Sequence, residues 1–161
     1  MNFSMAAGRG YQCFDTGLNT MSLYVTPMGH VLVYYDGGDL SEKCLKKALE
    51  IFDPEKDELV LVMVVPSARI GERDTVPDIT VAEARAFVDA TLERLAKEGV
   101  HAIGIVHEGD VAQELANIAN SMNVKSLVIP DEPNKKVGRF MVGNLAEMVL
   151  KVSSRPVLVV K

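Results

Sequence analysis

Residues 31–52 read VLVYYDGGDLSEKCLKKALEIF, which is an apolar run, a short turn with two glycines and a helical pattern. Every side chain in the run 31–35 is aliphatic or aromatic, as is typical of a strand buried on both faces. In the helical part, apolar side chains recur at spacings of three and four, and lysine and glutamate fill the opposite face. The stretch therefore predicts one βα unit, the building block of a parallel sheet.

The same alternation continues along the chain. Further short apolar runs lie at 59–65, 102–106, 126–129 and 157–160, and segments with helical periodicity separate them. Four helical segments begin with capping-box spacing, in Asp39 with Glu42, Thr80 with Glu83, Asp110 with Gln113, and Asn144 with Glu147. The faces predicted to be buried include Phe87 in the second helix and Val152 in the fourth. We predict five parallel strands and four helices joined by right-handed crossovers.

Composition and charge restrict the classes of partner. The 161 residues are 48% hydrophobic and 24% charged, which suits one globular domain. The net charge of −5 has the wrong sign for neutralising a polyanion, so no nucleic-acid partner is expected. No apolar run approaches the roughly 20 residues that cross a bilayer, and no leader is recognisable. Cys13 and Cys44 lack metal-binding or redox spacing, so we expect a cytoplasmic protein with reduced thiols and no membrane partner.

The first 29 residues differ from the rest of the chain. They hold only two charges, Arg9 and Asp15, and they contain four methionines and four glycines. Neither strand alternation nor helical periodicity extends over a useful length. We therefore predict a flexible N-terminal arm over 1–29 and a folded domain over 30–161.

A ligand site is expected at the carboxyl ends of the strands, where ligands bind in open parallel sheets. Asp36 and two glycines follow the first run, His107 follows the third, and residues 130–144 follow the fourth. The glycine patterns of the common phosphate-binding loops are absent, and Asp36 has no acidic neighbour to hold a divalent cation. His107 lacks an evident nucleophile. The sequence therefore indicates no catalytic residues and no metal site.

Several segments in order along the chain resemble the universal stress protein domain. They are Asp36-Gly37-Gly38, Met63-Val64-Val65-Pro66, residues 107–112 and residues 155–160. The strongest similarity is residues 143–150, GNLAEMVL, which is similar to the family's GSVAEYVL segment at the start of the last helix. The resemblance covers residues 30–161. It implies a three-layer α/β sandwich, Rossmann-like and adenine nucleotide alpha hydrolase-like, with a five-stranded parallel sheet of order 3-2-1-4-5.

The resemblance also implies a stress-response or signalling module that is not an enzyme. In the family, the last strand pairs with its counterpart in a second subunit. The run 157–160 is apolar, and an exposed strand edge of this kind would otherwise invite uncontrolled pairing. We therefore expect a homodimer formed through the C-terminal strand, with protein partners recognised by the segment 67–79 or by the arm.

The ATP-binding branch of that family has two glycines, a nine-residue spacing and then a Gly-Ser or Gly-Thr pair before the last helix. Counting back from Gly143, the earlier glycine positions hold Pro130 and Pro133, and the serine position holds Asn144. Proline fixes φ and has no N–H to donate to a phosphate. Losing two charge-assisted donors costs about 3–6 kcal/mol, or about two to four decades of affinity. We therefore predict weak ATP binding or none.

Other parts of the family's nucleotide site are retained. Asp36 stands at the position of a ribose or adenine contact, and Val64 at a position that lines the adenine slot. Gly143 and Asn144 precede a helix N-terminus, whose amides favour an anion. An adenine-nucleotide sensor that binds ATP, ADP or AMP, with Mg²⁺ for a triphosphate, is therefore the alternative hypothesis.

These residues also have simpler interpretations. Asp36 could only form the turn into the first helix, and Asn144 could only cap the last one. The basic residues Lys135, Lys136 and Arg139 could replace the lost amides as phosphate ligands, or could form a solvated loop that balances Asp131 and Glu132.

Overall fold

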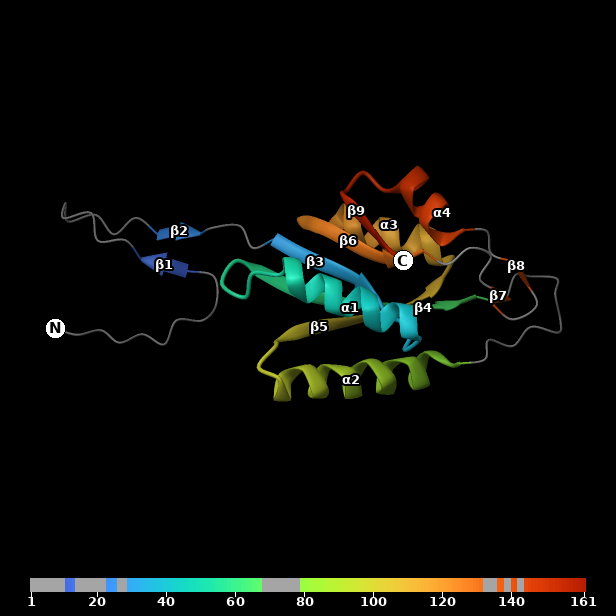
Figure 1. The fold of residues 1–161 in the computed structure, drawn as a ribbon, viewed down its shortest axis with the longest axis horizontal. Coiled ribbons are helices and arrows are strands. Elements are labelled where there is room, and N and C mark those ends of the chain that lie inside the picture. Colours follow the sequence, from blue (N-terminus) through green and yellow to red (C-terminus); the bar gives the residue numbers. More distant parts are fainter. Residues whose placement is uncertain are drawn as a thin grey trace.

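A five-stranded parallel sheet forms the centre of the computed structural model (Figure 1). The structure describes residues 29–67, 79–131 and 144–161, together with the backbone of the short strands at 11–13, 23–25, 136–137 and 140–141. The sheet comprises β3 (Gly29–Tyr34), β4 (Asp57–Pro66), β5 (Ala102–Gly109), β6 (Val124–Pro130) and β9 (Val157–Val160).

The order of these strands is β5-β4-β3-β6-β9, and all neighbours are parallel. Counted along the chain, this order is 3-2-1-4-5, which confirms the predicted fold class. The chain proceeds outward from β3 through β4 to β5 and then returns to β6 on the other side. The strand order therefore reverses between β3 and β6, which is the point where open α/β sheets bind ligands.

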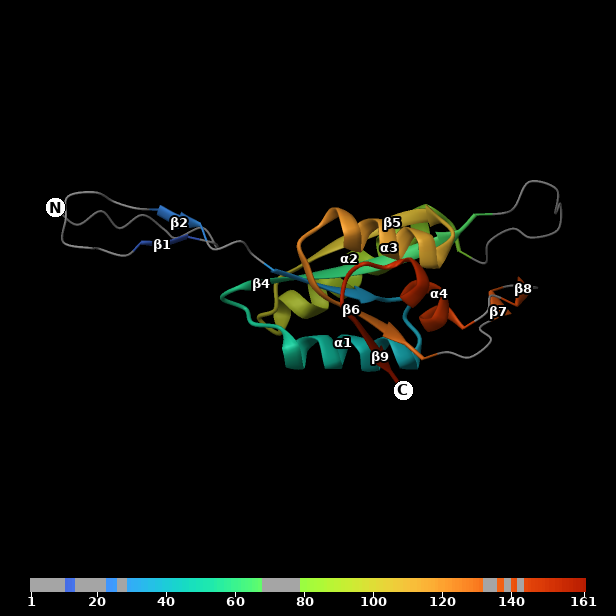
Figure 2. The same cartoon turned by 90° about the horizontal axis from the view of Figure 1, so that it is seen from above.

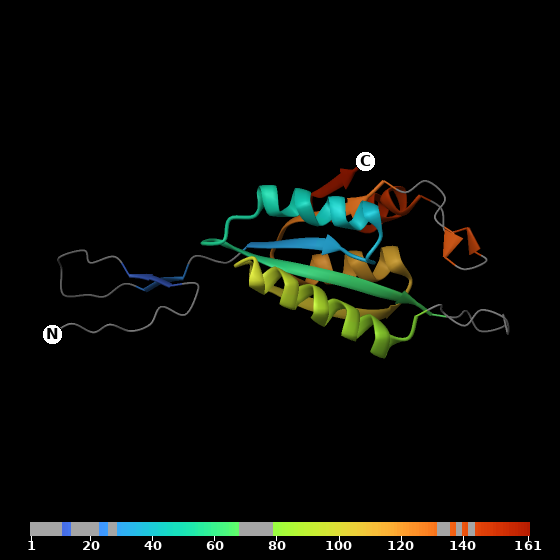
Figure 3. The same ribbon diagram turned by 60° about the horizontal axis from the view of Figure 1, so that its bottom comes forward.

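Helices cover both faces of the sheet. On one face lie α1 (Asp39–Ile51) and α2 (Val81–Lys97), and Figure 3 shows β3 and β4 between these two helices. On the other face lie α3 (Val111–Ser121) and α4 (Leu145–Val152), so the view from above in Figure 2 shows the sheet between two helical layers.

The core is divided between these two faces because successive side chains of a strand point to opposite sides. Under α3 and α4, the core contains Leu32, Val62, Leu115, Leu127 and Val149, among others. Under α1 and α2, it contains Val33, Leu61, Cys44, Ala48 and Leu95, among others. The near-continuous apolar runs of the sequence follow from this two-sided burial.

Two small antiparallel sheets accompany the central one. β1 (Tyr11–Cys13) pairs with β2 (Leu23–Val25) inside the segment predicted to be a flexible arm. β7 (Lys136–Val137) pairs with β8 (Phe140–Met141) between β6 and α4. The other residues of the predicted arm before Gly29 lie outside the described part of the chain.

The predicted capping of α2 is confirmed in full. Thr80 Oγ1 accepts a hydrogen bond from the Glu83 amide at 3.2 Å, and Glu83 Oε2 accepts one from the Thr80 amide at 2.8 Å. Asp110 also caps α3 as predicted, because its carboxylate accepts from the Gln113 amide at 3.0 Å.

The prediction that Asp39 caps α1 is wrong. Gly38 is the N-cap residue, it makes no side-chain cap bond, and Asp39 is already the first helical residue. The cause is the preceding turn, in which the carboxylate of Asp36 accepts from the Gly38 amide at 3.0 Å. Asp39 and Glu42 both remain in the first turn, where negative charge favours the helix dipole.

Candidate functional site

Three of the predicted site residues lie at the carboxyl edge of the sheet. The Tyr35 amide donates to the Val62 carbonyl at 2.9 Å, which continues the β3–β4 ladder and leaves Asp36 as the first residue beyond it. Val64 lies near the end of β4, and Asn144 precedes α4. Tyr34, Val64 and Leu145 share the core cluster under α3 and α4, so these segments meet on one face.

Asp36 holds the turn that leads into α1. Its Oδ1 accepts the 3.0 Å bond from Gly38, in the manner of an Asx turn. Gly37 has a φ of +82°, and a Cβ there would lie 2.5 Å from Phe87 Cζ, so only glycine suits the position. Asp36 therefore does form the turn into α1, and the turn fixes its carboxylate at the edge of the sheet.

Val64 forms part of the floor of the site. Its side chain is only 5% exposed and belongs to the cluster that contains Val111, Ala112 and Leu145. A flat apolar group could therefore contact Val64 from one side only.

Asn144 is the N-cap residue of α4. Its Oδ1 accepts from the Ala146 amide at 3.0 Å, and not from Glu147 as the capping-box spacing predicts. The Nδ2 group is the side-chain donor that Asn144 can offer to an anion at this helix N-terminus. The exposed Glu147 in the first turn weakens that attraction because it brings a negative charge to the same helix end. Gly143 lies outside the described residues.

Pro130 occupies the position where the resembled ATP motif has its first glycine. It is buried as the last residue of β6, and the next amide, that of Asp131, donates to the Val160 carbonyl at 2.7 Å. Neither position can give an N–H to a phosphate, since proline has none and the Asp131 amide is already used. The residues present therefore do not fit a tightly bound triphosphate.

The other residues proposed to contact phosphate cannot be placed. Pro133, Lys135 and Arg139 lie outside the described part of the chain, and Lys136 is described only as backbone of β7. Whether this basic group replaces the lost amides stays a hypothesis.

His107 is not an isolated residue at a strand end. It lies within β5, and its Nδ1 is 2.8 Å from Glu114 Oε2 on α3. Gly109 allows this contact, because a Cβ there would lie 2.9 Å from Glu114 Cγ. The spacing of seven residues crosses a strand, a turn and a helix, so sequence periodicity does not reveal the pair.

A second polar cluster lies on the opposite face of the same edge, between α1 and α2. The Tyr35 hydroxyl donates to Glu42 Oε1, and Arg94 Nη2 donates to the same oxygen at 2.8 Å. The Tyr35 and Phe87 rings are stacked with centroids 5.8 Å apart, and the group lines a hollow of about 320 Å³. Burial, together with Glu42, raises the pKa of Tyr35.

The stability that Glu42 contributes through this cluster depends on pH. Burial raises its pKa, but hydrogen bonds from Tyr35 and Arg94 outweigh burial, and the net pKa is lowered. A carboxyl with a lowered folded-state pKa contributes stability above its unfolded pKa, and loses it as pH falls through the folded value. Between pH ~5 and pH ~3, we expect the free energy of unfolding to fall by about 1 kcal/mol more in wild type than in Glu42→Gln. The difference is modest because water screens the half-exposed Arg94.

Urea unfolding across that pH range measures the difference between wild type and Glu42→Gln. Glu50→Gln is the matched control, because Glu50 pairs with Lys47 on the exposed face of the same helix. Parallel pH curves for wild type and Glu42→Gln would contradict the coupling.

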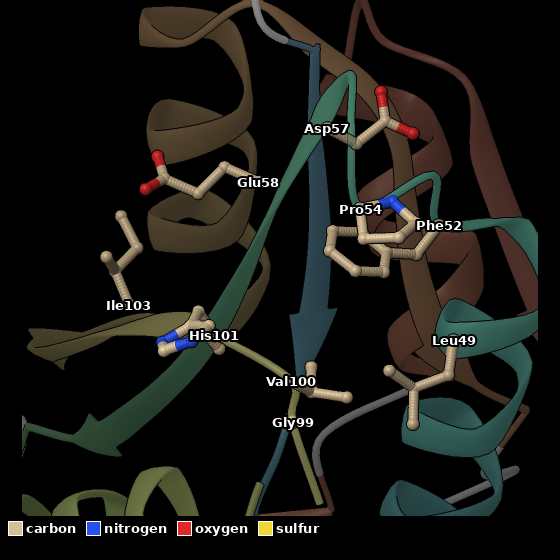
Figure 4. Close-up of a pocket in the computed structure, with 10 residues that line it drawn as sticks. Leu49, Phe52, Pro54, Asp57, Glu58, Gly99, Val100, His101 and Ile103 are labelled. Atoms are coloured by element: carbon tan, nitrogen blue, oxygen red, sulfur yellow. The ribbon is translucent and has the colours of Figure 1, made fainter. Parts of the chain in front are cut away.

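A hollow larger than the one beside Tyr35 lies at the other end of the sheet. It has a volume of about 690 Å³ and is lined by Leu49, Phe52, Asp57 and Glu58, among others (Figure 4). The buried Asp57 carboxylate is already paired, with Lys125 Nζ at 2.8 Å and the Asp53 amide at 3.0 Å. Because the amino ends of parallel strands seldom bind ligands, we keep the candidate site at the carboxyl edge, on the face under α3 and α4.

No three His, Cys, Asp or Glu side chains lie together as potential metal ligands in the described ranges 29–67, 79–131 and 144–161. Among these same residues, no helix has the length and apolar character that a membrane span requires.

The sheet, whose strand order reverses between β3 and β6, defines a Rossmann-like α/β protein. The model of the Universal stress protein family matches residues 28–161, and the chain belongs to that family.

Individual relatives agree with this assignment. Universal stress protein YxiE of Bacillus subtilis is 26% identical over 144 residues, covering 81% of this chain and 97% of the relative. The structure of universal stress protein UspA from Lactobacillus plantarum has a TM-score of 0.64 at 17% identity, covering 84% of this chain and 99% of that one. A universal stress protein in complex with cAMP has a TM-score of 0.61 at 19% identity, covering 83% and 97% respectively.

Proposed function

We propose that this universal stress protein is a dimeric stress-response or signalling module whose strand-end site does not bind ATP tightly. The buried Pro130 carries the proposal, because it stands where a phosphate-binding amide is needed. The role is binding and interaction, not catalysis, and we place it in the cytoplasm. Partner proteins would contact the segment 67–79 or the N-terminal arm, which lie largely outside the described residues.

A second candidate function is the binding of an adenine nucleoside monophosphate. The observation that supports it is that Tyr34, Val64 and Leu145 share one core cluster, and that Asp36 follows β3 while Asn144 directly precedes Leu145. A monophosphate needs only the amides and the Asn144 side chain at the start of α4, and it does not reach for the lost loop. A universal stress protein solved in complex with cAMP supports a ligand with a single phosphate.

The dimer is proposed through β9. In the described part of the chain, this strand pairs with β6 on one side, and no strand covers its other edge. Leu158 is exposed there in an otherwise apolar strand. An open apolar edge of this kind favours pairing with a second copy of itself.

Thermal shift with AMP, cAMP, ADP and ATP, with and without Mg²⁺, tests both candidates. A ligand at ten times its Kd raises the free energy of unfolding by about 1.4 kcal/mol. For a domain of this size, that raises the melting temperature by about 3–5 °C. We expect millimolar AMP or cAMP to give such a shift and ATP with Mg²⁺ to give no larger one. A shift with micromolar ATP would overturn the main proposal, and no shift with any nucleotide would overturn the second candidate.

Two variants at position 36 assign the shift to this edge. Asp36→Ala removes both the charge and the turn, so it is expected to abolish the shift. Asp36→Asn keeps an oxygen that can accept from the Gly38 amide, and it therefore separates loss of the ligand contact from loss of the turn. An unchanged shift in both variants would place the ligand elsewhere.

A further inference from the structure

The β5 strand brings His107 beside Val64. The two residues are register partners in the parallel β4–β5 pair. Val64 belongs to the core under α3 and α4, and Ile105, two residues before His107, packs against the same core. Because side chains alternate along a strand, His107 is on this face as well. Any flat group that rests on Val64 therefore has His107 at its side.

A contact with α3 determines which ring nitrogen of His107 carries the proton. Glu114 Oε2 lies 2.8 Å from Nδ1, and an ionised carboxylate can only accept, so Nδ1 carries a proton and donates it. In the neutral imidazole, Nε2 then has a lone pair and accepts. The ring is 46% exposed, and among the described residues no hydrogen-bond partner is placed on Nε2.

The residues just before Glu114 in the sequence fix its position. The carboxylate of Asp110 caps the first turn of α3, and Gly109 leaves room for the Glu114 side chain to pass over the backbone. Glu114 is only 25% exposed, which restricts its movement. The acceptor at Nε2 is thus presented by an ordered pair and not by a freely rotating surface histidine.

The polar groups of this edge follow one another across the sheet. Asn144 begins α4, which packs against β6, while Asp36 follows β3, Val64 lies on β4 and His107 lies on β5. Neighbouring strands are about 4.8 Å apart, so the four strands from β6 to β5 extend over about 14 Å at this edge. A nucleoside monophosphate presents phosphate, sugar, base plane and base edge in this same order.

We propose that His107 is a specificity-determining residue that reads the substituent at position 6 of a purine, an inference that rests on the monophosphate binding proposed above. The 6-amino group of adenine donates a hydrogen bond, which the Nε2 lone pair accepts. The 6-oxo group of hypoxanthine or guanine is itself an acceptor and faces that lone pair. The site therefore selects 6-aminopurine over 6-oxopurine nucleotides.

Calorimetric titration of the full chain with AMP and with IMP tests the inference, because these ligands differ at that substituent and the adjacent ring nitrogen. We expect wild type to bind AMP at least about tenfold more tightly than IMP. His107→Ala is expected to weaken AMP binding and bring the ratio of the two affinities close to one. Glu114→Gln is expected to reduce the ratio as well, because an amide can donate or accept and no longer fixes the proton on Nδ1.

Glu108→Gln is the matched control. It removes one carboxylate from the neighbouring position of β5, whose side chain points to the other face, so the ratio should equal that of wild type. An equal preference for AMP in wild type and His107→Ala would overturn the inference while leaving nucleotide binding intact. Absence of AMP binding to wild type at millimolar concentration would overturn the proposed monophosphate binding and this inference with it.

Discussion

Leu115→Ala is expected to lower the free energy of unfolding by about 3 kcal/mol, since a fully buried leucine leaves a cavity when it is truncated. Leu115 is 0% exposed in the middle of α3. It belongs to the cluster that joins Val62 and Leu127 of the sheet to Val149 of α4. The cost is high because strands on one side and α4 on the other prevent collapse around the cavity.

Leu150→Ala provides the matched control, because it makes the same substitution in a helix of the same layer. Leu150 is 56% exposed, so the variant should change stability by less than about 0.5 kcal/mol. Urea denaturation of both variants at one pH gives the comparison. A loss below about 1 kcal/mol in Leu115→Ala, or equal losses in the two variants, would contradict the described core.

The sheet was predictable because its strands are buried on both faces. Runs such as 31–35 and 59–65 contain no polar side chain that would need solvent, and the corresponding strands are Gly29–Tyr34 and Asp57–Pro66. The predicted ends differ by a few residues because polar groups can join the ladder at the rim. Asp57, for example, enters β4 as a buried residue paired with Lys125.

Two helical residues were wrongly predicted to be buried. Phe87 is partly exposed because it lies at the carboxyl edge, where its ring stacks on Tyr35 and covers Gly37 instead of entering the core. Val152 is exposed at the end of α4. Helical periodicity identifies the side of a helix that faces the sheet, but it cannot show where the sheet ends beneath that side.

The candidate site was predictable in location but not in detail. The general rule for parallel sheets points to the strand ends, and it leads to Asp36, Val64 and Asn144. The contacts that position their neighbours join residues distant in the sequence, as in the Glu42–Arg94 pair, 52 residues apart. Such contacts depend on how helices cross the sheet, and no short pattern in the sequence carries that information.

Leu158→Asp is expected to convert the proposed dimer into a monomer. Leu158 is 36% exposed on β9, which is only four residues long and pairs with β6. If β9 pairs with its counterpart in a second subunit, the two copies of position 158 lie near the symmetry axis, so both introduced carboxylates become buried together. Removing such charges from water without partners costs several kcal/mol, so the dissociation constant should rise about 100-fold or more.

Ile103→Asp separates this effect from a general loss of stability. Ile103 is 38% exposed on β5, the edge strand at the opposite side of the same sheet, so the substitution makes an equivalent change in an equivalent setting. Sedimentation at micromolar concentration should show a dimer for wild type and Ile103→Asp, and a folded monomer for Leu158→Asp. A monomeric wild type would refute the dimer itself. A monomer only for Ile103→Asp would place the interface on β5, because the two edges are the positions where this sheet can add a strand.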